Sequence, residues 1–223
     1  MKTIRTPDPQ KTLNLLRYVT PPEVTAFTTG CDCPLETVGL RLEDLALPRQ
    51  THSDHVLWMR ASGRPEDTDA VITDVPGLCV CVKTADCIPV LLYDLRQRVV
   101  AAAHAGWRGT VKRIVQLTIR EMGSRPHDLH AIIGPGISQA AFEVGDEVYD
   151  AFLQAGFPME RIAVRQNKWH LDLPDANRWL LEQCGVPDIQ VAGLCTYSPS
   201  GRFYSARRDG LQTGRNFNGI MLL

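Results

Sequence analysis

Short apolar runs with the character of β-strands recur along this chain and limit the folds open to it. We predict ten strands, over residues 24–29, 55–59, 69–73, 78–83, 89–94, 98–104, 129–134, 161–165, 189–193 and 202–208. Helical spacing of apolar residues predicts helices over residues 110–122, 146–155 and 173–184. Because strands and helices do not alternate strictly, the predicted fold class is α+β in layers, not a doubly wound parallel sheet. Several runs mix continuous apolar stretches with alternation, which indicates a sheet face buried against another layer.

The balance of charge argues against several classes of partner. The net charge is −1 and 44% of the residues are hydrophobic. Nucleic-acid-binding proteins usually carry a basic excess, so we expect no nucleic-acid partner. No apolar run reaches the ~20 residues of a membrane helix, so we expect no membrane contact. Residues 1–10 lack the apolar core of a signal peptide, which predicts a cytoplasmic protein. From the length of the chain, we expect a single domain over residues 1–223.

The seven cysteines do not indicate a disulfide framework, because an odd number cannot pair completely. Cys79 and Cys81 alternate in an apolar run, and we expect them to be buried packing residues. Cys31 and Cys33 lack a second pair at zinc-knuckle spacing and are predicted to lie in a loop. The histidines in ordinary polar contexts are expected at the surface: His127, His130 and His170.

Three residues in separate turn-like segments form a candidate metal site. They are His52 in QTHSDHV (50–56), Cys87 in KTADCIPVLL (83–92) and His104 in AAAHAGWRG (101–109). Two imidazoles and one thiolate suit zinc, and a zinc ion with three protein ligands keeps a fourth position open for chemistry. If the three segments converge, the sequence therefore predicts a catalytic metal centre.

The surroundings of each residue favour a functional role over packing. His104 ends a strand of small residues and precedes a glycine-containing turn, so its side chain is expected in a cleft. Cys87 lies in a polar turn, where its thiolate would serve as a ligand or a nucleophile. Residues three apart on an extended chain face opposite ways, so we expect one ligand from His52 and His55. We prefer His52, because it lies in the turn, whereas His55 begins the strand.

Other polar groups would complete such a site. Asp54 or Asp86 would accept the second N–H of a ligating histidine. The turn at Gly134–Gly136 would present N–H groups to an anion, although it also reads as a simple connection. Arginine side chains recognise phosphate in a bidentate way, and otherwise mark a solvated strand edge. The C-terminal stretch contains four of them: Arg202, Arg207, Arg208 and Arg215.

Three motifs are specific enough, when they occur together, to indicate a family. They are Q-x-H at 50–52, T-A-D-C-x-P at 84–89 and H-A-G-W-R-G at 104–109. Further agreement comes from Gly134-Pro135-x-Ile137, Phe142-Glu143-Val144-Gly145, Cys195-Thr196, Ser205-x-Arg207-Arg208 and Gly214-Arg215. From about residue 27 to its end, the chain resembles the YfiH/laccase-domain family, also called the peptidoglycan editing factor or purine nucleoside phosphorylase-type family.

The resemblance implies a four-layer α-β-β-α sandwich and an enzyme that acts on purine nucleosides. It implies zinc, with copper as the alternative metal, held by His52, Cys87 and His104. The implied reactions are phosphorolysis of adenosine, inosine and methylthioadenosine to the base and ribose 1-phosphate (or methylthioribose 1-phosphate), and deamination of adenosine. Purine nucleosides and phosphate are therefore the expected partners, and the sequence leaves the oligomeric state open.

Within this hypothesis the candidate catalytic residues are Cys87, His104 and Asp86, and either Asp86 or a metal-linked group would protonate the departing base. The candidate substrate-binding residues are Gln50, Thr84, Arg108, Arg207 and Arg208. The chain departs from the family pattern in a shortened segment, GCDCPLETVGLRLEDLALP, at 30–48. We expect the shorter segment to widen the pocket or remove one of its walls and thereby to affect substrate preference more than the chemistry.

Three other functions remain open at this stage. A zinc site or a Cys87–His104 dyad would also serve an amidase that removes a wrong amino acid from a UDP-muramoyl cell-wall precursor. A copper-dependent polyphenol oxidase would use the same two histidines and cysteine, but six histidines without an H-x-H motif are too few for a multicopper array. A purely structural metal clamp would need a fourth protein ligand, such as His55 or Cys195.

Overall fold

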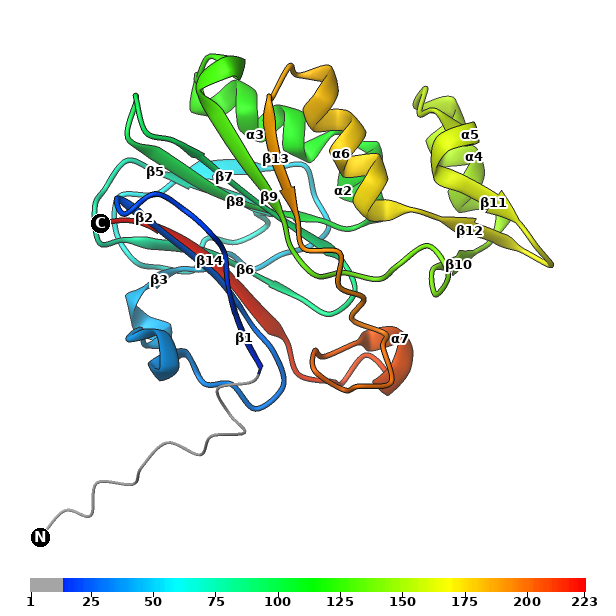
Figure 1. The fold of residues 1–223 in the computed structure, drawn as a ribbon, viewed down its shortest axis with the longest axis horizontal. Helices are drawn as coiled ribbons and strands as arrows, with labels where there is room; N and C mark the ends of the chain where they lie inside the picture. The colour runs from blue at the N-terminus through cyan, green and yellow to red at the C-terminus, as the bar shows by residue number, and fades with distance from the viewer. Residues whose placement is uncertain (1–13) are drawn as a thin grey trace, which may run out of the picture.

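Two large β-sheets lie face to face in the computed structural model, which describes residues 14–223 (Figure 1). The five-stranded sheet has the order β1 (Leu15–Arg17), β2 (Val24–Thr29), β14 (Asn216–Leu222), β6 (Cys79–Thr84), β3 (Leu45–Ala46). The six-stranded sheet has the order β13 (Asp188–Val191), β9 (Leu129–Ile133), β7 (Ile88–Asp94), β8 (Val99–Ala105), β5 (Ala70–Thr73), β4 (Val56–Trp58). A small sheet has the order β10 (Glu143–Val144), β12 (Trp169–Leu171), β11 (Ala163–Arg165).

Helices cover the outer face of the six-stranded sheet (Figure 1). They are α2 (Trp107–Val111), α3 (Ile114–Met122) and α6 (Leu173–Gln183). The remaining helices are α4 (Asp146–Gln154), α5 (Met159–Ile162), α7 (Ala206–Asp209), η1 (Leu35–Val38), η2 (Leu42–Asp44) and η3 (Pro126–Asp128). Within residues 14–223, no helix has both the length and the apolar character required to cross a membrane.

Three separate apolar cores show that the chain forms four layers. The first core lies between the helices and the six-stranded sheet, and the second lies between the two sheets. The third lies between the outer face of the five-stranded sheet and the segment that carries η1 and η2. Since this outer layer consists of short 3₁₀ turns, the expected α-β-β-α sandwich is present with one thin layer.

The central strands serve two cores at once, because alternate side chains point to opposite faces of a strand. In β7, Val90 and Leu92 face the helices, whereas Leu91 and Tyr93 face the other sheet. The β8 strand follows the same rule with small residues. This double burial explains why these strands are nearly continuous apolar runs in the sequence.

Most of the predicted elements are confirmed with small changes in their ends. The predicted helix 110–122 begins earlier, at Trp107, and is divided by Arg113, which has a left-handed φ of 64°. The strand predicted over 161–165 is shorter, because α5 occupies its first residues. The predicted helices 146–155 and 173–184 correspond to α4 and α6.

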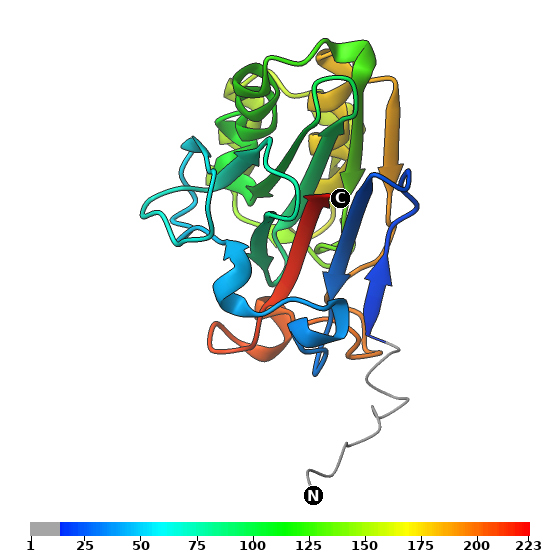
Figure 2. The same cartoon turned by 90° about the vertical axis from the view of Figure 1, so that its left-hand side faces the viewer.

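Two features at the C-terminus correct the prediction. Residues 202–208 form no strand; they run through a turn into α7, where the side chain of Ser205 accepts a hydrogen bond from the N–H of Arg208 and caps the helix. The central strand β14 was not predicted, because Asn216, Asn218 and Gly219 interrupt its apolar pattern. Figure 2 shows β14 in red beside the blue β2, and antiparallel hydrogen bonds join the two strands.

The connection between β6 and β7 positions the candidate site. The β6 strand belongs to the five-stranded sheet and β7 to the six-stranded sheet, so the chain passes from one sheet to the other at residues 85–87. Next to β7, His104 lies near the end of β8 and pairs with Pro89. The candidate residues therefore gather at the end of the sandwich where the two sheets meet.

Candidate functional site

The structure brings His52, Cys87 and His104 together. One potential ligand atom from each side chain lies within 4.8 Å of the others. The Nε2 atom of His52 is 3.8 Å from the Sγ atom of Cys87, and the rings of His52 and His104 meet edge to face at 4.9 Å. The His104 side chain is buried, that of Cys87 is half-buried and that of His52 is exposed, so the group opens to solvent on one side.

Unusual backbone conformations hold two of these residues in place. His52 has a φ of 63°, and Asp86, directly before Cys87, has a φ of 91°. Residues other than glycine rarely adopt positive φ values. Those that do are found mainly where the surrounding structure fixes them, often at functional sites. Both turns are therefore specified by contacts with the rest of the fold.

The carboxylate of Asp69 supplies many of these contacts. Its Oδ1 atom accepts hydrogen bonds from Nδ1–H of His104 at 2.7 Å and from the backbone N–H of His52 at 3.1 Å. Its Oδ2 atom accepts from the N–H of Thr51 and from both the N–H and the hydroxyl of Ser53, over 2.8–3.0 Å. One fully buried carboxylate thus fixes the turn that carries His52 and the ring of His104.

The prediction that Asp54 or Asp86 accepts the second N–H of a ligating histidine is wrong. Asp69, which was not predicted, accepts it from His104. Asp54 pairs with the ammonium of Lys112 at 3.2 Å. Asp86 accepts from the hydroxyl of Thr196 at 2.6 Å and from the N–H of Arg207 at 2.7 Å. The sequence does show Asp69 directly before an apolar strand. Its role becomes clear only from the pairing of Ala70 with Ala103, which brings Asp69 opposite His104.

Burial and charge act in opposite directions on Cys87 and His104. Burial raises the pKa of the Cys87 thiol. The positive charge of His104 and the hydrogen bonds from both imidazoles outweigh burial and lower this pKa to about 6. Burial lowers the pKa of His104, but the charge of Cys87 and the hydrogen bond to Asp69 raise it to about 9. Near neutral pH, the two side chains therefore form a thiolate–imidazolium pair in the metal-free protein.

Asp69 remains ionised for a related reason. Burial raises the pKa of its carboxyl group, but the hydrogen bonds from His104, Thr51 and Ser53 outweigh burial and hold the pKa well below its ordinary value. An ionised carboxylate can only accept hydrogen bonds, so Nδ1 of His104 carries the proton. Loss of the other imidazolium proton, the one on Nε2, would therefore free the Nε2 lone pair for a metal.

Because Gly106 has no side chain, it leaves space for the three side chains of the group to lie close together. A Cβ atom at this position would lie 2.9 Å from Sγ of Cys87 and 2.9 Å from Cδ2 of His52. Contacts this short do not occur between real Cβ atoms and their neighbours, so any larger residue would displace one of these side chains. The glycine in the H-A-G-W-R-G motif therefore has a steric role in this group.

A cavity of about 470 Å³ opens beside the three residues. Ile137, Phe142 and Leu211 form the apolar part of its wall. The guanidinium carbon of Arg207 lies over the ring of Phe142, 5.7 Å from the ring centroid. The polar and charged lining consists of Gln50, Lys83, Asp86, Arg207 and Arg215, in addition to His52, Cys87 and His104. This volume lies within the range of small-molecule sites.

Some of the predicted substrate-binding residues line this cavity. Gln50 does, and its amide also bonds the backbone N–H and carbonyl of Lys83 at 2.9 and 2.8 Å. Arg207 lines the cavity with its guanidinium bonded to the carbonyls of Ala141 and Glu143, each at 3.0 Å. Asp86 lines it as well, although both of its carboxylate oxygens already accept hydrogen bonds.

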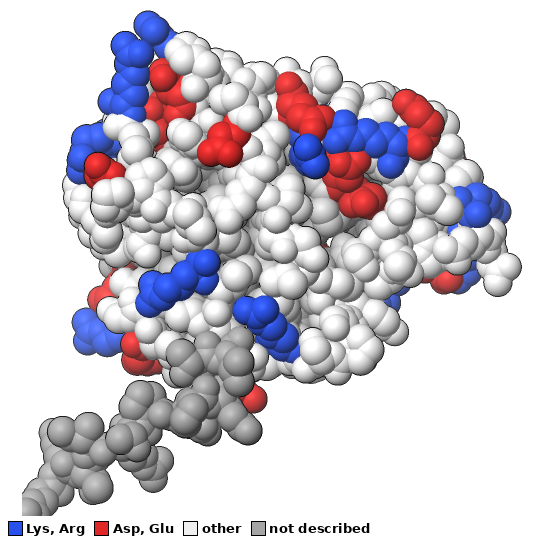
Figure 3. Space-filling view, viewed as in Figure 1, with Lys and Arg blue, Asp and Glu red and all other residues white. Residues whose placement is uncertain are grey.

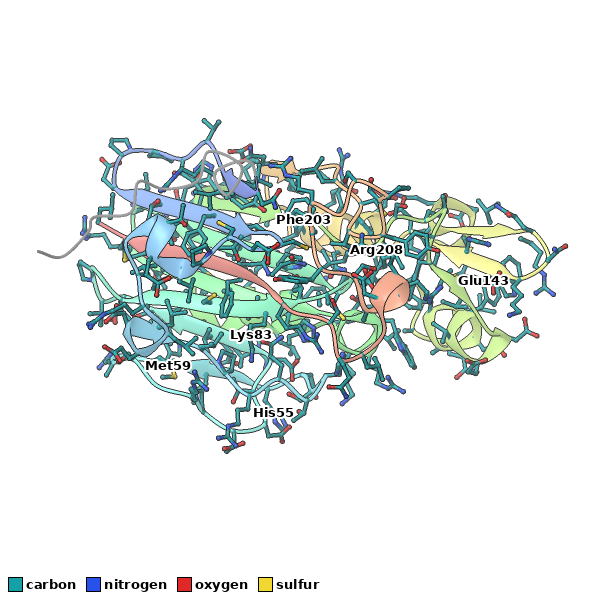
Figure 4. The ribbon with its side chains drawn as sticks, turned by 90° about the horizontal axis from the view of Figure 1, so that it is seen from below. His55, Met59, Lys83, Glu143, Phe203 and Arg208 are labelled. Atoms are coloured by element: carbon teal, nitrogen blue, oxygen red, sulfur yellow. The ribbon has the colours of Figure 1, made fainter. Side chains whose placement is uncertain are left out.

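Other predicted residues lie away from the cavity lining. Thr84 is buried, and its hydroxyl accepts a hydrogen bond from the side chain of Asn218 at 3.1 Å. Arg108 packs over the ring of Trp107 at 4.3 Å. Arg208 bonds three backbone carbonyls and pairs with Asp209; Figure 4 labels it near α7. Substrate binding by these three residues stays a prediction that their positions do not favour.

Of the two interpretations of the turn at Gly134–Gly136, the structure favours a simple connection, because its N–H groups already have partners. The N–H of Gly134 bonds the carbonyl of Pro89, and that of Gly136 bonds the carbonyl of Leu194. None of the residues of the shortened segment 30–48 lines the cavity, so this segment supplies no wall to it. It covers the five-stranded sheet instead, with Leu35, Leu40, Leu45 and Leu47 in the third core.

The remaining histidines lie outside the group. His55 is exposed, pairs with Asp67 at 3.0 Å and lies at the edge of the molecule in Figure 4. His130 stacks on Tyr93 with ring centroids 4.7 Å apart. His170, predicted at the surface, is buried and bonds the carbonyl of Gln139. Cys79 and Cys81 are buried packing residues, as predicted.

The donor set fits a metal ion. The group offers two imidazole nitrogens and a thiol whose pKa is low enough for thiolate near neutral pH, and Asp69 orients one imidazole. His55 and Cys195 do not join the group, and residues 14–223 contain no fourth protein ligand beside it. Three ligands match a catalytic centre better than a closed structural site.

Comparison with known proteins shows the family of the chain. Residues 12–223 match the family model described as multi-copper polyphenol oxidoreductase laccase. The chain is 45% identical to a purine nucleoside phosphorylase of Bacteroides thetaiotaomicron over 81% of its length and 74% of that protein. It is 41% identical to adenosine deaminase RL5 of an unknown prokaryotic organism, over 82% and 77%.

A solved structure supports the same assignment. The hypothetical protein YfiH of Bacillus licheniformis superposes with a TM-score of 0.83 and 30% identity, over 90% of this chain and 93% of that one. The sequence motifs, the layered fold and the family model all indicate the same family. The chain belongs to the YfiH/laccase-domain family, as its motifs predict.

Proposed function

We propose that the chain is a zinc enzyme that cleaves purine nucleosides with phosphate and also deaminates adenosine. The observation that carries the proposal is the His52–Cys87–His104 group, which opens into a cavity of about 470 Å³. The names of two relatives support the substrate class, because one is a purine nucleoside phosphorylase and the other an adenosine deaminase.

His52, Cys87 and His104 would hold the zinc ion. Bound by these residues, zinc would supply Lewis-acid chemistry and acidify water. Asp69 would keep His104 in the tautomer that leaves Nε2 free for the metal. Gly106 would keep the space between the donors clear.

In phosphorolysis, an oxygen of phosphate bonds to C1′ of the ribose while the bond from C1′ to the purine nitrogen breaks. The base leaves with the electron pair of that bond and gains a proton, so the products are the free base and ribose 1-phosphate. The apolar wall of Ile137, Phe142 and Leu211 suits a planar purine. Methylthioadenosine would react in the same way and give methylthioribose 1-phosphate.

Deamination differs because it consumes water and needs no phosphate. An oxygen from water bonds to C6 of adenine, and ammonia leaves from the same carbon, which yields inosine. Cys87 and His104 line the cavity and remain the candidate catalytic residues for both reactions. Asp86 remains a proposed proton donor, although its carboxylate accepts hydrogen bonds from Thr196 and Arg207.

Product analysis on zinc-loaded protein tests the proposal. Inosine, adenosine and methylthioadenosine are incubated with and without phosphate, and bases, sugar phosphates and ammonia are quantified. We expect hypoxanthine and ribose 1-phosphate from inosine only when phosphate is present, and inosine from adenosine in either condition. Absence of turnover in every condition would contradict the proposal.

Two controls separate this function from its rivals. Release of serine from UDP-muramoyl-serine, without nucleoside turnover, would favour the amidase. Phenol oxidation by copper-loaded protein would favour the oxidase, but residues 14–223 form a single His/Cys group, and the other histidines lie elsewhere. Removal of zinc with a chelator and its return should abolish and restore nucleoside turnover.

A further inference from the structure

Three cationic side chains line the cavity beside the His52–Cys87–His104 group: Lys83, Arg207 and Arg215. Within residues 14–223, none of the three forms an ion pair with a carboxylate. Several basic side chains elsewhere on the surface do pair with carboxylates. On the face in Figure 3, basic and acidic atoms adjoin over α6, where Arg161 pairs with Asp175 and Glu182.

Hydrogen bonds orient the two arginines without cancelling their charge. The guanidinium of Arg215 bonds the carbonyls of Leu211, Thr213 and Gly214. That of Arg207 bonds the carbonyls of Ala141 and Glu143. All of these acceptors are neutral, so both guanidinium groups keep a full positive charge at the cavity.

Lys83 is fixed through its backbone and keeps its ammonium group for a ligand. The amide of Gln50 bonds both the N–H and the carbonyl of Lys83. In the described part of the chain the ammonium has no hydrogen-bond partner, although the side chain is half-buried; Figure 4 labels Lys83 at the β6 strand. Burial, and then the charges of Arg64 and Arg215, lower the pKa of Lys83, which shows the positive field at this point.

The register of the five-stranded sheet brings two of these cations together. Lys83 pairs with Phe217 across β6 and β14, and Asn216 pairs with Thr84. Two residues before Phe217, Arg215 therefore lies diagonally across from Lys83 on the same face. Asp86, the acidic residue of the lining, forms no ion pair with these side chains, because its oxygens accept from Thr196 and the backbone of Arg207; Lys83, Arg207 and Arg215 therefore outnumber the carboxylate of the lining.

We propose that Lys83, Arg215 and Arg207 form a subsite for a phosphate dianion beside the His52–Cys87–His104 group. This inference rests on the proposed function and does not include Arg108 and Arg208, two of the substrate-binding residues that the sequence predicts. Phosphate accepts several charge-assisted hydrogen bonds at once, which matches one ammonium and two guanidinium groups without a carboxylate partner. The dianion would be free phosphate or the 5′-phosphate of a purine nucleotide.

Calorimetric titration with inorganic phosphate tests the subsite directly. Lys83→Met removes the charge and keeps most of the chain length, and Lys83→Arg restores a cation. Loss of a charged hydrogen bond should weaken phosphate binding about tenfold or more in Lys83→Met, with partial recovery in Lys83→Arg. Arg60→Met is the matched control, since Arg60 pairs with Asp74 and does not line the cavity.

Kinetics and a nucleotide titration distinguish the source of the phosphate. If free phosphate is the ligand, Lys83→Met should raise the KM for phosphate about tenfold or more and leave the KM for inosine within about twofold. If a nucleotide is the ligand, adenosine 5′-monophosphate should bind tightly to the wild type and weakly to Lys83→Met. Arg215→Met gives a second variant, and a melting curve for each variant excludes misfolding as the cause.

The outcomes separate the subsite from the proposed function. Wild-type protein that cleaves inosine, with a phosphate KM and nucleotide affinity unchanged by both Lys83→Met and Arg215→Met, would overturn the subsite alone. Lys83-dependent phosphate or nucleotide binding by a wild type without phosphorolysis would support the subsite and contradict the proposed function.

Discussion

Asp69 accepts a 2.7 Å hydrogen bond from Nδ1 of His104, and the same carboxylate holds the turn that carries His52. Two of the three candidate ligands therefore depend on one buried side chain that does not contact the cavity. Carboxylates in this position commonly fix the orientation of a ligating histidine and increase its basicity. This relationship makes the site sensitive to a residue outside the ligand set.

Asp69→Asn should weaken zinc binding about 10- to 100-fold and reduce turnover, because the amide cannot accept from all five donors. The measurement is a competitive zinc titration against a chelating dye. Asp67→Asn is the control, since Asp67 is exposed and contacts His55 and Thr51 outside the group. Equal zinc affinity in wild type and Asp69→Asn would show that Asp69 has no such role.

Gly106→Ala should disturb the site more than the fold. The new Cβ atom would meet Cys87 and His52 at 2.9 Å, so we expect reduced zinc content and little turnover in a protein that still melts cooperatively. Gly63→Ala provides the comparison, because its Cβ would meet the flexible end of Met59 at 3.4 Å. Full zinc content in Gly106→Ala would argue against the steric role.

The thiol of Cys87 should be unusually reactive in metal-free protein. Because its pKa is lowered to about 6, the thiolate fraction rises as the pH increases through 6. The rate of alkylation by iodoacetamide, followed by peptide mass spectrometry, should therefore increase between about pH 5 and pH 7 and then level off. Burial raises the pKa of Cys79 to about 12, so that residue should stay unmodified.

Two variants of the alkylation experiment identify the cause. Zinc should protect Cys87, and His104→Ala should move the midpoint to higher pH, because the positive charge that lowers the thiol pKa is lost. A midpoint that stays at the same pH in His104→Ala would mean that this imidazole does not stabilise the thiolate.

Thr84→Val tests whether Thr84 binds substrate. Its hydroxyl accepts from Asn218, which also bonds Thr28 and the carbonyl of Val82 in the buried space between strands. We expect a loss of about 1–3 kcal/mol in the free energy of unfolding, because a buried donor loses its acceptor, and an unchanged KM for inosine. Urea denaturation and steady-state kinetics measure the two effects, with Thr84→Ser as the control. A raised KM at unchanged stability would restore the sequence-based role.

The fold was predictable from the sequence wherever burial produced continuous apolar runs. The strands β5 to β9 stand out for this reason, since both of their faces are covered. The β14 strand escaped prediction because Asn216 and Asn218 occupy it. In the folded protein, their amides bond neighbouring strands and loops, so these polar residues satisfy buried groups that no local pattern indicates.

The candidate site was predictable only where the residue types themselves indicate chemistry. His52, Cys87 and His104 could be proposed because imidazoles and a thiolate suit a metal. Asp69 and Lys83 could not, since their roles follow from long-range pairing, of Ala70 with Ala103 in one sheet and of Lys83 with Phe217 in the other. Residues that act through such pairing carry no local signal.

The central claim is that the His52–Cys87–His104 group performs the nucleoside chemistry, and His104→Ala tests it most directly. Zinc content and phosphate-dependent release of hypoxanthine from inosine are measured for the variant and the wild type, with His127→Ala as the exposed-histidine control. We predict that His104→Ala loses most of its zinc and its turnover, while His127→Ala keeps both. Wild-type zinc content and turnover in His104→Ala would contradict the assignment of the site.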